Sequence, residues 1–126
     1  NFKLYNDTYG HAAGDTILIK ISEILRSYTL RSGEYAFRLG GEEFGILLSN
    51  MSRDEYYALA NRICSAVENL HLPHAQNTAG EYVTVSIGIA VYESQSAMSC
   101  DDIYKEADKQ LYLAKENGRN RVMIGE

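Results

Sequence analysis

Two glycines and then two glutamates stand in a row at Gly40, Gly41, Glu42 and Glu43, with short apolar segments on both sides. This pattern predicts a tight β-hairpin turn that carries acid groups. Glycine permits positive φ and lets a ligand approach the backbone closely. Carboxylates at such a turn can hold a hard cation such as Mg²⁺, which prefers oxygen ligands and usually keeps a phosphate as another ligand. Taken alone, an acidic pair at a turn is more often simply solvated.

The residues of this turn resemble the signature of the GGDEF family, the diguanylate cyclases, in its GGEEF form. Enzymes of that family condense two GTP molecules into cyclic di-GMP and release pyrophosphate. The resemblance implies a divalent cofactor, Mg²⁺ or Mn²⁺, which lowers the pKa of a coordinated hydroxyl. It also implies that Glu42 binds the metal and accepts the proton, that Glu43 supports the metal site, and that the triphosphate passes close to the backbone at Gly41.

The first eleven residues, NFKLYNDTYGH, are a second match. They resemble the family segment D-x-D-x-F-K-x-x-N-D-x-x-G-H without its first three positions, with Phe2 and Lys3 as the F-K pair. The resemblance implies that Lys3 is catalytic, because it faces the phosphates and stabilises charge in the transition state. It also makes Asn6 and Asp15 the contacts to guanine, since an amide and a carboxylate can pair with its carbonyl, amino and ring N–H groups. Read alone, Asn6 is an ordinary turn residue and Asp15 an acid near a helix start.

A third match lies near the C-terminus, where the sequence AKENGRN resembles the family segment A-K-x-x-G-R-N. The resemblance implies that Lys115 and Arg119 close over the triphosphate, where cations are expected on electrostatic grounds. Without the other matches, these would be ordinary cations at a helix C-terminus. We also expect His11 near the nucleotide, although a lone histidine more often packs or caps than binds a ligand.

The family also has a product-inhibition site that reads R-x-x-D shortly before the signature. The corresponding residues here are Arg31 and Glu34, so the arginine is retained and a longer acid replaces Asp. We treat this pair as a possible inhibitory site for cyclic di-GMP, with a geometry shifted by one methylene group.

The chain opens inside the second match, so we expect a single GGDEF domain over residues 1–126 that lacks the family's first helix and first strand. The family's first metal-binding Asp would lie three residues before Asn1. We therefore expect these residues alone to bind metal poorly and to turn over little.

Three functions remain open. The first is a catalytic domain that acts as a transient dimer, with one GTP on each copy, under the control of an upstream sensory domain. The second is a domain that binds GTP or cyclic di-GMP and regulates a neighbour without catalysis. The third, and weakest, is a cyclase that makes a cyclic mononucleotide from a single nucleotide.

The composition of the chain limits the kinds of partner that we expect it to bind. The 126 residues are 45% hydrophobic and 23% charged, and 12 basic against 17 acidic residues give a net charge of −5. This charge balance argues against nucleic acid as a partner, because binding nucleic acid requires a basic patch.

Cys64 and Cys100 make no disulfide framework, and Cys64 is predicted to be a small buried hydrophobe. No apolar run approaches the roughly 20 residues of a membrane span. A cytoplasmic domain fits best, with any membrane anchor of the parent protein outside this sequence.

Apolar spacing predicts three helices. The first covers residues 12–30 and is followed by Gly33, the second opens at Arg53, and the third opens after the capping residue Ser99 and ends at Asn117-Gly118. Their apolar positions are Ile17, Ile21, Ile24, Leu25 and Tyr28, then Tyr56, Leu59, Ala60, Ile63, Val67 and Leu70, then Ile103, Ala107, Leu111 and Ala114.

Four strands are predicted, over residues 35–39, 43–49, 82–92 and 121–124. The third is the clearest, with branched apolar residues on one face and Thr84, Ser86, Gly88 and Ala90 on the other, small enough for a helix to lie close. Residues 71–80, broken by Pro73, are predicted as a loop with room for a short edge strand. The order of elements indicates an α+β fold with a central, mainly antiparallel sheet flanked by helices. That agrees with the GGDEF fold, which is related to nucleotidyl cyclases and the polymerase palm.

Overall fold

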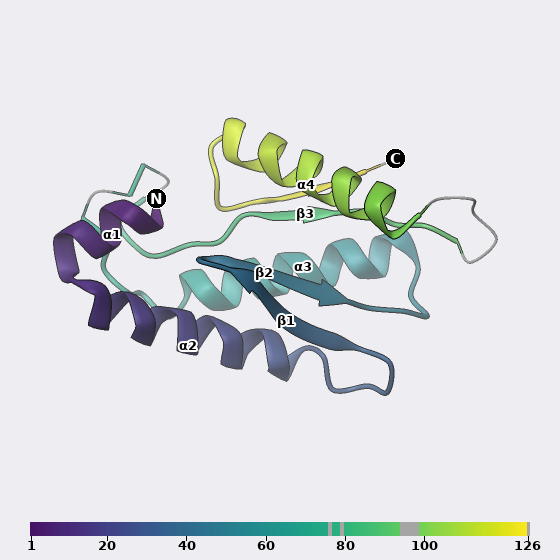
Figure 1. Ribbon diagram of the computed structural model, residues 1–126, viewed down its shortest axis with the longest axis horizontal. Coiled ribbons are helices and arrows are strands. Elements are labelled where there is room, and N and C mark those ends of the chain that lie inside the picture. The colour runs from purple at the N-terminus through teal and green to yellow at the C-terminus, as the bar shows by residue number, and fades with distance from the viewer. Residues whose placement is uncertain (76, 79, 94–98, 126) are drawn as a thin grey trace.

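The computed structural model describes residues 1–75, 77–78, 80–93 and 99–125. These residues form four helices and four strands (Figure 1). The helices are α1 (Phe2–Tyr9), α2 (His11–Ser27), α3 (Arg53–Glu68) and α4 (Cys100–Glu116), and the strands are β1 (Tyr35–Gly40), β2 (Glu43–Leu47), β3 (Ile87–Ile89) and β4 (Val122–Ile124). Within this part of the chain, no helix combines the length and the apolar character that a membrane crossing requires.

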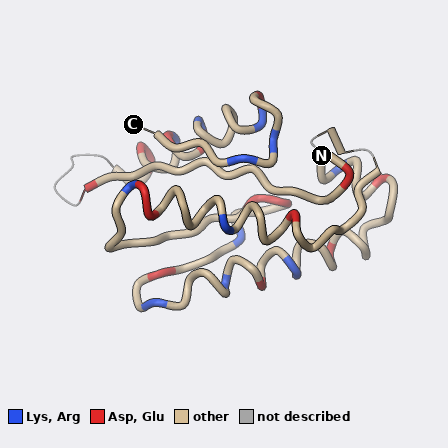
Figure 2. Tube along the Cα trace, turned by 180° about the vertical axis from the view of Figure 1, so that it is seen from behind, with Lys and Arg blue, Asp and Glu red and all other residues tan. Residues whose placement is uncertain are grey.

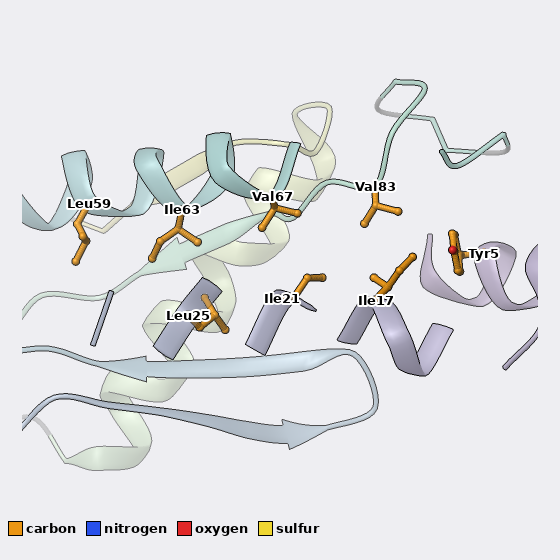
Figure 3. Close-up of a cluster of buried hydrophobic side chains, with 8 residues drawn as sticks. All are labelled: Tyr5, Ile17, Ile21, Leu25, Leu59, Ile63, Val67 and Val83. Carbon is orange, nitrogen blue, oxygen red and sulfur yellow. The ribbon is translucent and has the colours of Figure 1, made fainter. Parts of the chain in front are cut away.

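Helices α2 and α3 enclose the main hydrophobic core. The α3 helix begins after Ser52, whose side chain accepts a hydrogen bond from the Glu55 N–H, and Asp54 and Glu55 lie at its positive end. Figure 3 shows the apolar side chains of α2 and α3 pointing toward one another. The core comprises Tyr5, Ile17, Ile21, Leu25, Leu59, Ile63, Val67 and Val83. The 3.6-residue periodicity therefore identified the buried faces of both helices correctly.

Two helices end earlier than their apolar patterns predicted. The α2 helix ends at Ser27 rather than at residue 30, because the hydroxyls of Ser27 and Thr29 donate to the carbonyls of Ile24 and Leu25 at 2.6 and 3.1 Å. Side-chain donors thus satisfy the last carbonyls in place of a further helical turn. The α3 helix ends at Glu68, so Leu70 lies beyond it and is 39% exposed rather than buried.

Strands β1 and β2 form the predicted hairpin. They pair in antiparallel register, with Arg38 opposite Phe44 and an irregularity just before Gly40. On the outer face the ring of Phe37 covers Gly45 so closely that a Cβ atom on the glycine would contact it. The inner face contributes Ala36, Phe44 and Ile46 to the core. The hairpin turn is thereby held at one end of a two-stranded sheet that is packed on one side only.

Strands β3 and β4 lie parallel, with helix α4 connecting them. Ile87 pairs with Val122 and Ile89 with Ile124. The α4 helix begins with a capping box, in which Ser99 and Asp102 exchange hydrogen bonds between side chain and backbone. A Cβ atom on Gly88 would collide with the α4 backbone, which confirms that a small residue on this face of the strand lets a helix lie close.

The strand predicted over residues 82–92 is wrong in extent. Only Ile87–Ile89 forms a strand, because β4 offers just three residues to pair with it. Before β3, Tyr82 makes an isolated bridge to Pro73. Among the described residues, this bridge is all that forms of the short edge strand for which the prediction for residues 71–80 left room. Val83 and Val85 nevertheless face the core, so the alternation of side chains is correct even where strand pairing is absent.

The mixed class of helices flanking a small sheet is confirmed. Among the described residues, hydrogen-bonded strands form two separate pairs, the antiparallel hairpin and the parallel β3–β4 pair. Helix α4 lies along β3 and β4, whereas α2 packs beside the hairpin (Figure 1). Charged residues of both signs are distributed along the helices (Figure 2).

Candidate active site

The hairpin turn presents the two glutamates to solvent. Gly40 and Gly41 have φ values of 150° and 51°, in the region that favours glycine, and a Cβ atom on either would meet nothing within 4 Å. The glycines are therefore needed for the backbone conformation rather than for space. The Nε of Arg38 donates to the Gly41 carbonyl at 2.8 Å and braces the turn. Glu42 follows in the turn, Glu43 begins β2, and both side chains are exposed.

A short helix that the sequence analysis missed carries the residues of the second match. Helix α1 runs from Phe2 to Tyr9 and is separated from α2 by Gly10, whose φ is 91°. Lys3 is exposed on this helix, whereas Asn6 is half-buried. The signal was weak because eight residues give barely two turns of periodicity, and Asn, Asp and Thr disfavour a helix interior.

Asn6 packs against the first turn of α2. A Cβ atom on Gly14 would collide with the Asn6 side-chain oxygen, so this glycine allows the two helices to approach. The Oδ1 atom of Asn6 is buried and has no hydrogen-bond partner among the described residues. Asp15 follows Gly14 and is exposed on α2. The structure therefore leaves a buried amide acceptor that needs a partner beside Gly14, the residue that precedes Asp15 in the chain.

Lys115 and Arg119 lie on either side of the end of α4. Lys115 is exposed in the last turn of the helix, and Arg119 is half-buried in the following loop. Arg119 and Asn120 have φ values of 62° and 47°, and the Arg119 N–H donates to the Ala114 carbonyl at 2.9 Å. The side-chain amide of Asn120 donates to a carboxylate oxygen of Glu68 at 2.7 Å, which ties this loop to α3. The loop is thus held from both sides.

The three segments meet at one end of the molecule. In Figure 1 the start of α1, the β1–β2 turn and the C-terminal end of α4 lie at the same end. The positive charges of Arg119 and Lys115 and the negative charge of Glu42 all act on the backbone nitrogen of Asn1, which agrees with this proximity. Glu42 and Arg119, which are 77 positions apart in sequence, therefore influence the same point.

The Arg31–Glu34 pair lies apart from this cluster (Figure 1). Arg31 and Glu34 stand at the base of the hairpin and pair with each other, with 3.4 Å between the Arg31 Nε and a Glu34 oxygen. The Arg31 backbone N–H also donates to Glu34, and its guanidinium donates to the Ser49 carbonyl at 3.2 Å. Glu34 is only 8% exposed. His11 is the exposed first residue of α2.

Few side chains of the described residues are placed to coordinate a metal ion. No group of three or more His, Cys, Asp or Glu side chains there is arranged to hold an ion. Glu42 and Glu43 supply carboxylate oxygens, the donor type that Mg²⁺ prefers, and leave most coordination positions to other ligands. That donor set fits an ion held jointly with the phosphates of a nucleotide.

The side chains of Glu42, Glu43 and Lys115 are exposed at the candidate site. One hollow of 460 Å³ lies between α4 and the ends of β3 and β4, and its lining includes Tyr92, Glu106 and Gln110. Another of 320 Å³ lies beside the start of α3. None of the residues from the three matches lines either hollow, so neither bears on the chemistry assigned to them.

Comparison with known proteins decides the family. The sequence model described as "Diguanylate cyclase, GGDEF domain" matches residues 1–121. The chain belongs to the GGDEF domain family. A curated relative, Diguanylate cyclase A of Treponema denticola, is 44% identical over 125 residues, which are 98% of this chain and 32% of that protein. The chain thus spans about a third of that relative.

Solved GGDEF domains have the same fold. The active GGEEF domain of a diguanylate cyclase from Vibrio cholerae matches with a TM-score of 0.80 at 32% identity, over 100% of this chain and 77% of that one. The GGDEF domain of DgcB from Caulobacter crescentus in complex with c-di-GMP matches with a TM-score of 0.85 at 29% identity, over 98% and 71%. These neighbours confirm the palm-like fold class.

Proposed function

We propose that this GGDEF domain is the catalytic domain of a Mg²⁺-dependent diguanylate cyclase. The observation that carries the proposal is the convergence of Glu42, Lys115 and Arg119 at the start of helix α1. An acidic turn beside two cations is the arrangement expected where a metal–triphosphate complex binds. Membership of a family whose relatives include a named diguanylate cyclase supports the same activity.

In the proposed reaction, the 3′-hydroxyl of one GTP attacks the α-phosphorus of the other and pyrophosphate leaves. Bound Mg²⁺ would make the coordinated hydroxyl more acidic and neutralise charge on the phosphates. Glu42 and Glu43 would hold the ion, and Glu42 would accept the hydroxyl proton. The open turn at Gly41 leaves room for the triphosphate beside the backbone. Manganese could take the place of magnesium, because both are bound through oxygen ligands.

Substrate binding is assigned to the flanking segments. Asn6, through its unpartnered Oδ1 or amide nitrogen, and Asp15 would recognise guanine. Lys3, Lys115 and Arg119 would contact the phosphates, with Lys3 acting on charge that develops in the transition state. His11 is proposed to lie near the nucleotide, since it opens the helix that carries Asp15.

Each copy of the domain would hold one GTP, so two copies must face each other during catalysis. The site is compatible with this, because its carboxylates and cations are accessible to a nucleotide on a second copy. An upstream sensory domain would control that encounter. Cyclic di-GMP would inhibit at Arg31 and Glu34, which requires their mutual ion pair to open.

A regulatory domain that binds GTP or cyclic di-GMP without catalysis is the second candidate. The observation that favours it is the small number of metal donors among the described residues. For the same reason, we propose that residues 1–126 alone turn over poorly.

The deciding experiment uses the full-length protein that carries this chain. It is incubated with GTP and Mg²⁺, the products are separated by chromatography, and Glu42→Ala is compared with Glu23→Ala, which removes an exposed acid from α2. We expect cyclic di-GMP from the parent and from Glu23→Ala, and a loss of at least about 100-fold in Glu42→Ala, as for other groups that stabilise a transition state. Unconverted GTP under conditions that permit dimers would favour the regulatory domain, and a cyclic mononucleotide would indicate the third function.

A further inference from the structure

The loop between α3 and β3 folds back on itself beside helix α1. Its two arms are joined by the bridge between Pro73 and Tyr82, and the His74 N–H donates to the Glu81 carbonyl at 2.8 Å. At the base of the loop, the Val83 N–H donates to the Leu72 carbonyl at 2.7 Å. These backbone hydrogen bonds fix the position of His74 independently of α1.

The side chain of His74 reaches from this loop to the first residue of the α1 region. The residue is only 4% exposed. Its Nε2 atom lies 3.1 Å from the Asn1 carbonyl oxygen, and because a carbonyl only accepts, Nε2 must carry the hydrogen. The ring also meets the Tyr5 ring edge-on, with centroids 5.2 Å apart. Nδ1 has no hydrogen-bond partner among the described residues, so the polar contact of this side chain is directed at α1.

The same loop holds α1 at further points. The Ala75 N–H donates to the Tyr9 hydroxyl at 3.2 Å, at the far end of the helix. The side-chain amide of Asn1 donates to Asn77 Oδ1 at 2.8 Å and to the Thr78 hydroxyl at 3.0 Å. A helix of eight residues is too short to be stable alone in water, so its position depends on such contacts.

We propose that His74 is a positioning residue that orients α1, and with it Lys3 and Asn6, toward the nucleotide. This inference rests on the proposed function, because it assigns His74 to the placement of that same site. Lys3 and Asn6 lie between the two points where the loop holds α1, at Asn1 and Tyr9. Loss of the hydrogen bond to Asn1 would loosen the first turn of α1, in which Lys3 lies, and leave it held by the Asn1 side chain and by the Tyr5 ring in the core.

The test compares two replacements of His74 in the full-length protein. His74→Phe keeps a ring but loses the donor, whereas His74→Gln places an amide N–H near the position of Nε2. We expect His74→Phe to lower kcat/KM for GTP about fivefold, as the loss of one hydrogen bond predicts, with a higher KM because Asn6 shifts and a lower kcat because Lys3 shifts, and His74→Gln to restore most of the loss. His71→Phe is the matched control, because His71 is exposed in the same loop and stacks on Tyr82 rather than on α1.

A second readout separates this inference from the proposed function. Amide hydrogen exchange should become faster in residues 2–9 of His74→Phe but not of His71→Phe, whether or not the protein turns over GTP. If His74→Phe does not fold, His74→Asn takes its place, because its shorter amide cannot reach the Asn1 carbonyl. Unchanged exchange in α1 and an unchanged kcat/KM would overturn the positioning role. A parent protein that neither binds nor converts GTP would overturn the proposed function, and the exchange data would still decide whether His74 holds α1.

Discussion

The β1–β2 turn and helix α1 carry two parts of the same candidate site, but they are held in place differently. The turn is fixed by its own glycines and by Arg38, which lies three residues before Gly41. Helix α1 is fixed by Tyr5 in the core and by contacts to His74, Ala75, Asn77 and Thr78, far away in sequence. The site thus combines a turn whose conformation is fixed by its own residues with a helix whose position is fixed by residues distant in sequence.

The largest expected effect comes from removing the core anchor of α1. Tyr5→Ala should lower the free energy of unfolding by about 3 kcal/mol, because a buried aromatic ring is lost. Phe37→Ala, on the outer face of the hairpin, should cost about 1 kcal/mol, because Phe37 is 46% exposed. Denaturant unfolding of both variants measures the difference. Equal losses would mean that the hairpin depends on its side chains as much as α1 does.

Two glycine substitutions test the same difference between helix α1 and the β1–β2 turn. Gly14→Ala should lower stability by about 1–3 kcal/mol through overpacking, although alanine normally favours a helix, because its Cβ collides with Asn6. Gly41→Ala should cost about 1 kcal/mol, because it forces an L-residue to a φ of 51°. Thermal unfolding gives the stabilities and GTP titration the affinities. A Gly14→Ala variant as stable as the parent would show that α1 can shift without loss.

The ion pair at the base of the hairpin should matter less for stability. Arg31→Ala should lower it by about 1 kcal/mol, because the arginine side chain is 58% exposed and solvent weakens the pair, whereas the Glu34 side chain is 3% exposed and loses its cationic partner. The variant should also relieve inhibition by cyclic di-GMP, measured as the product concentration that halves the rate. Inhibition that survives in Arg31→Ala would place the inhibitory site elsewhere.

The smallest expected effect concerns the two cysteine thiols, through their reactivity and the pH dependence of stability. Burial, and to a lesser extent the charge of Glu68, raises the pKa of Cys64 to about 11, whereas Cys100 is exposed. Since the raised pKa belongs to the folded state, its stabilising contribution is complete below the ordinary thiol pKa of 9.0 and is lost as the pH rises through 11. At pH 8, a thiol reagent should modify Cys100 quickly and Cys64 slowly. Rapid labelling of Cys64 in the folded protein would contradict its burial.

The sequence predicted those parts of the molecule that depend on neighbouring residues. Periodicity located α2, α3 and α4, and the Gly-Gly pair located the turn. It overestimated the strand at 82–92, because strand length depends on a partner more than 30 residues away. The parallel pairing of β3 and β4 was missed, although a helix between two strands is typical of it.

In the candidate site, too, features that depend on neighbouring residues were predicted and features that depend on distant residues were not. The residues of the three matches were identified by their resemblance to the motifs of the GGDEF family, and the structure brings the hairpin, α1 and the α4–β4 loop to one end (Figure 1). The role of Gly14 and the contacts of His74 were not foreseen, because nothing near these residues in the sequence indicates which distant side chain they meet. Helix α1 was missed because it owes its stability to those contacts rather than to its composition.

The β3–α4–β4 unit has a consequence for the order of folding. Strand β4 pairs with a strand that was synthesised more than 30 residues earlier, whereas β1 and β2 are neighbours in sequence. Contacts between distant residues form more slowly than local ones. Lys115 lies in the last turn of α4 and Arg119 in the loop between α4 and β4, so this segment reaches its place only when β4 has paired. On the ribosome, the hairpin can form while β4 is still being made, and the candidate site is completed only after β4 has been synthesised and has paired with β3.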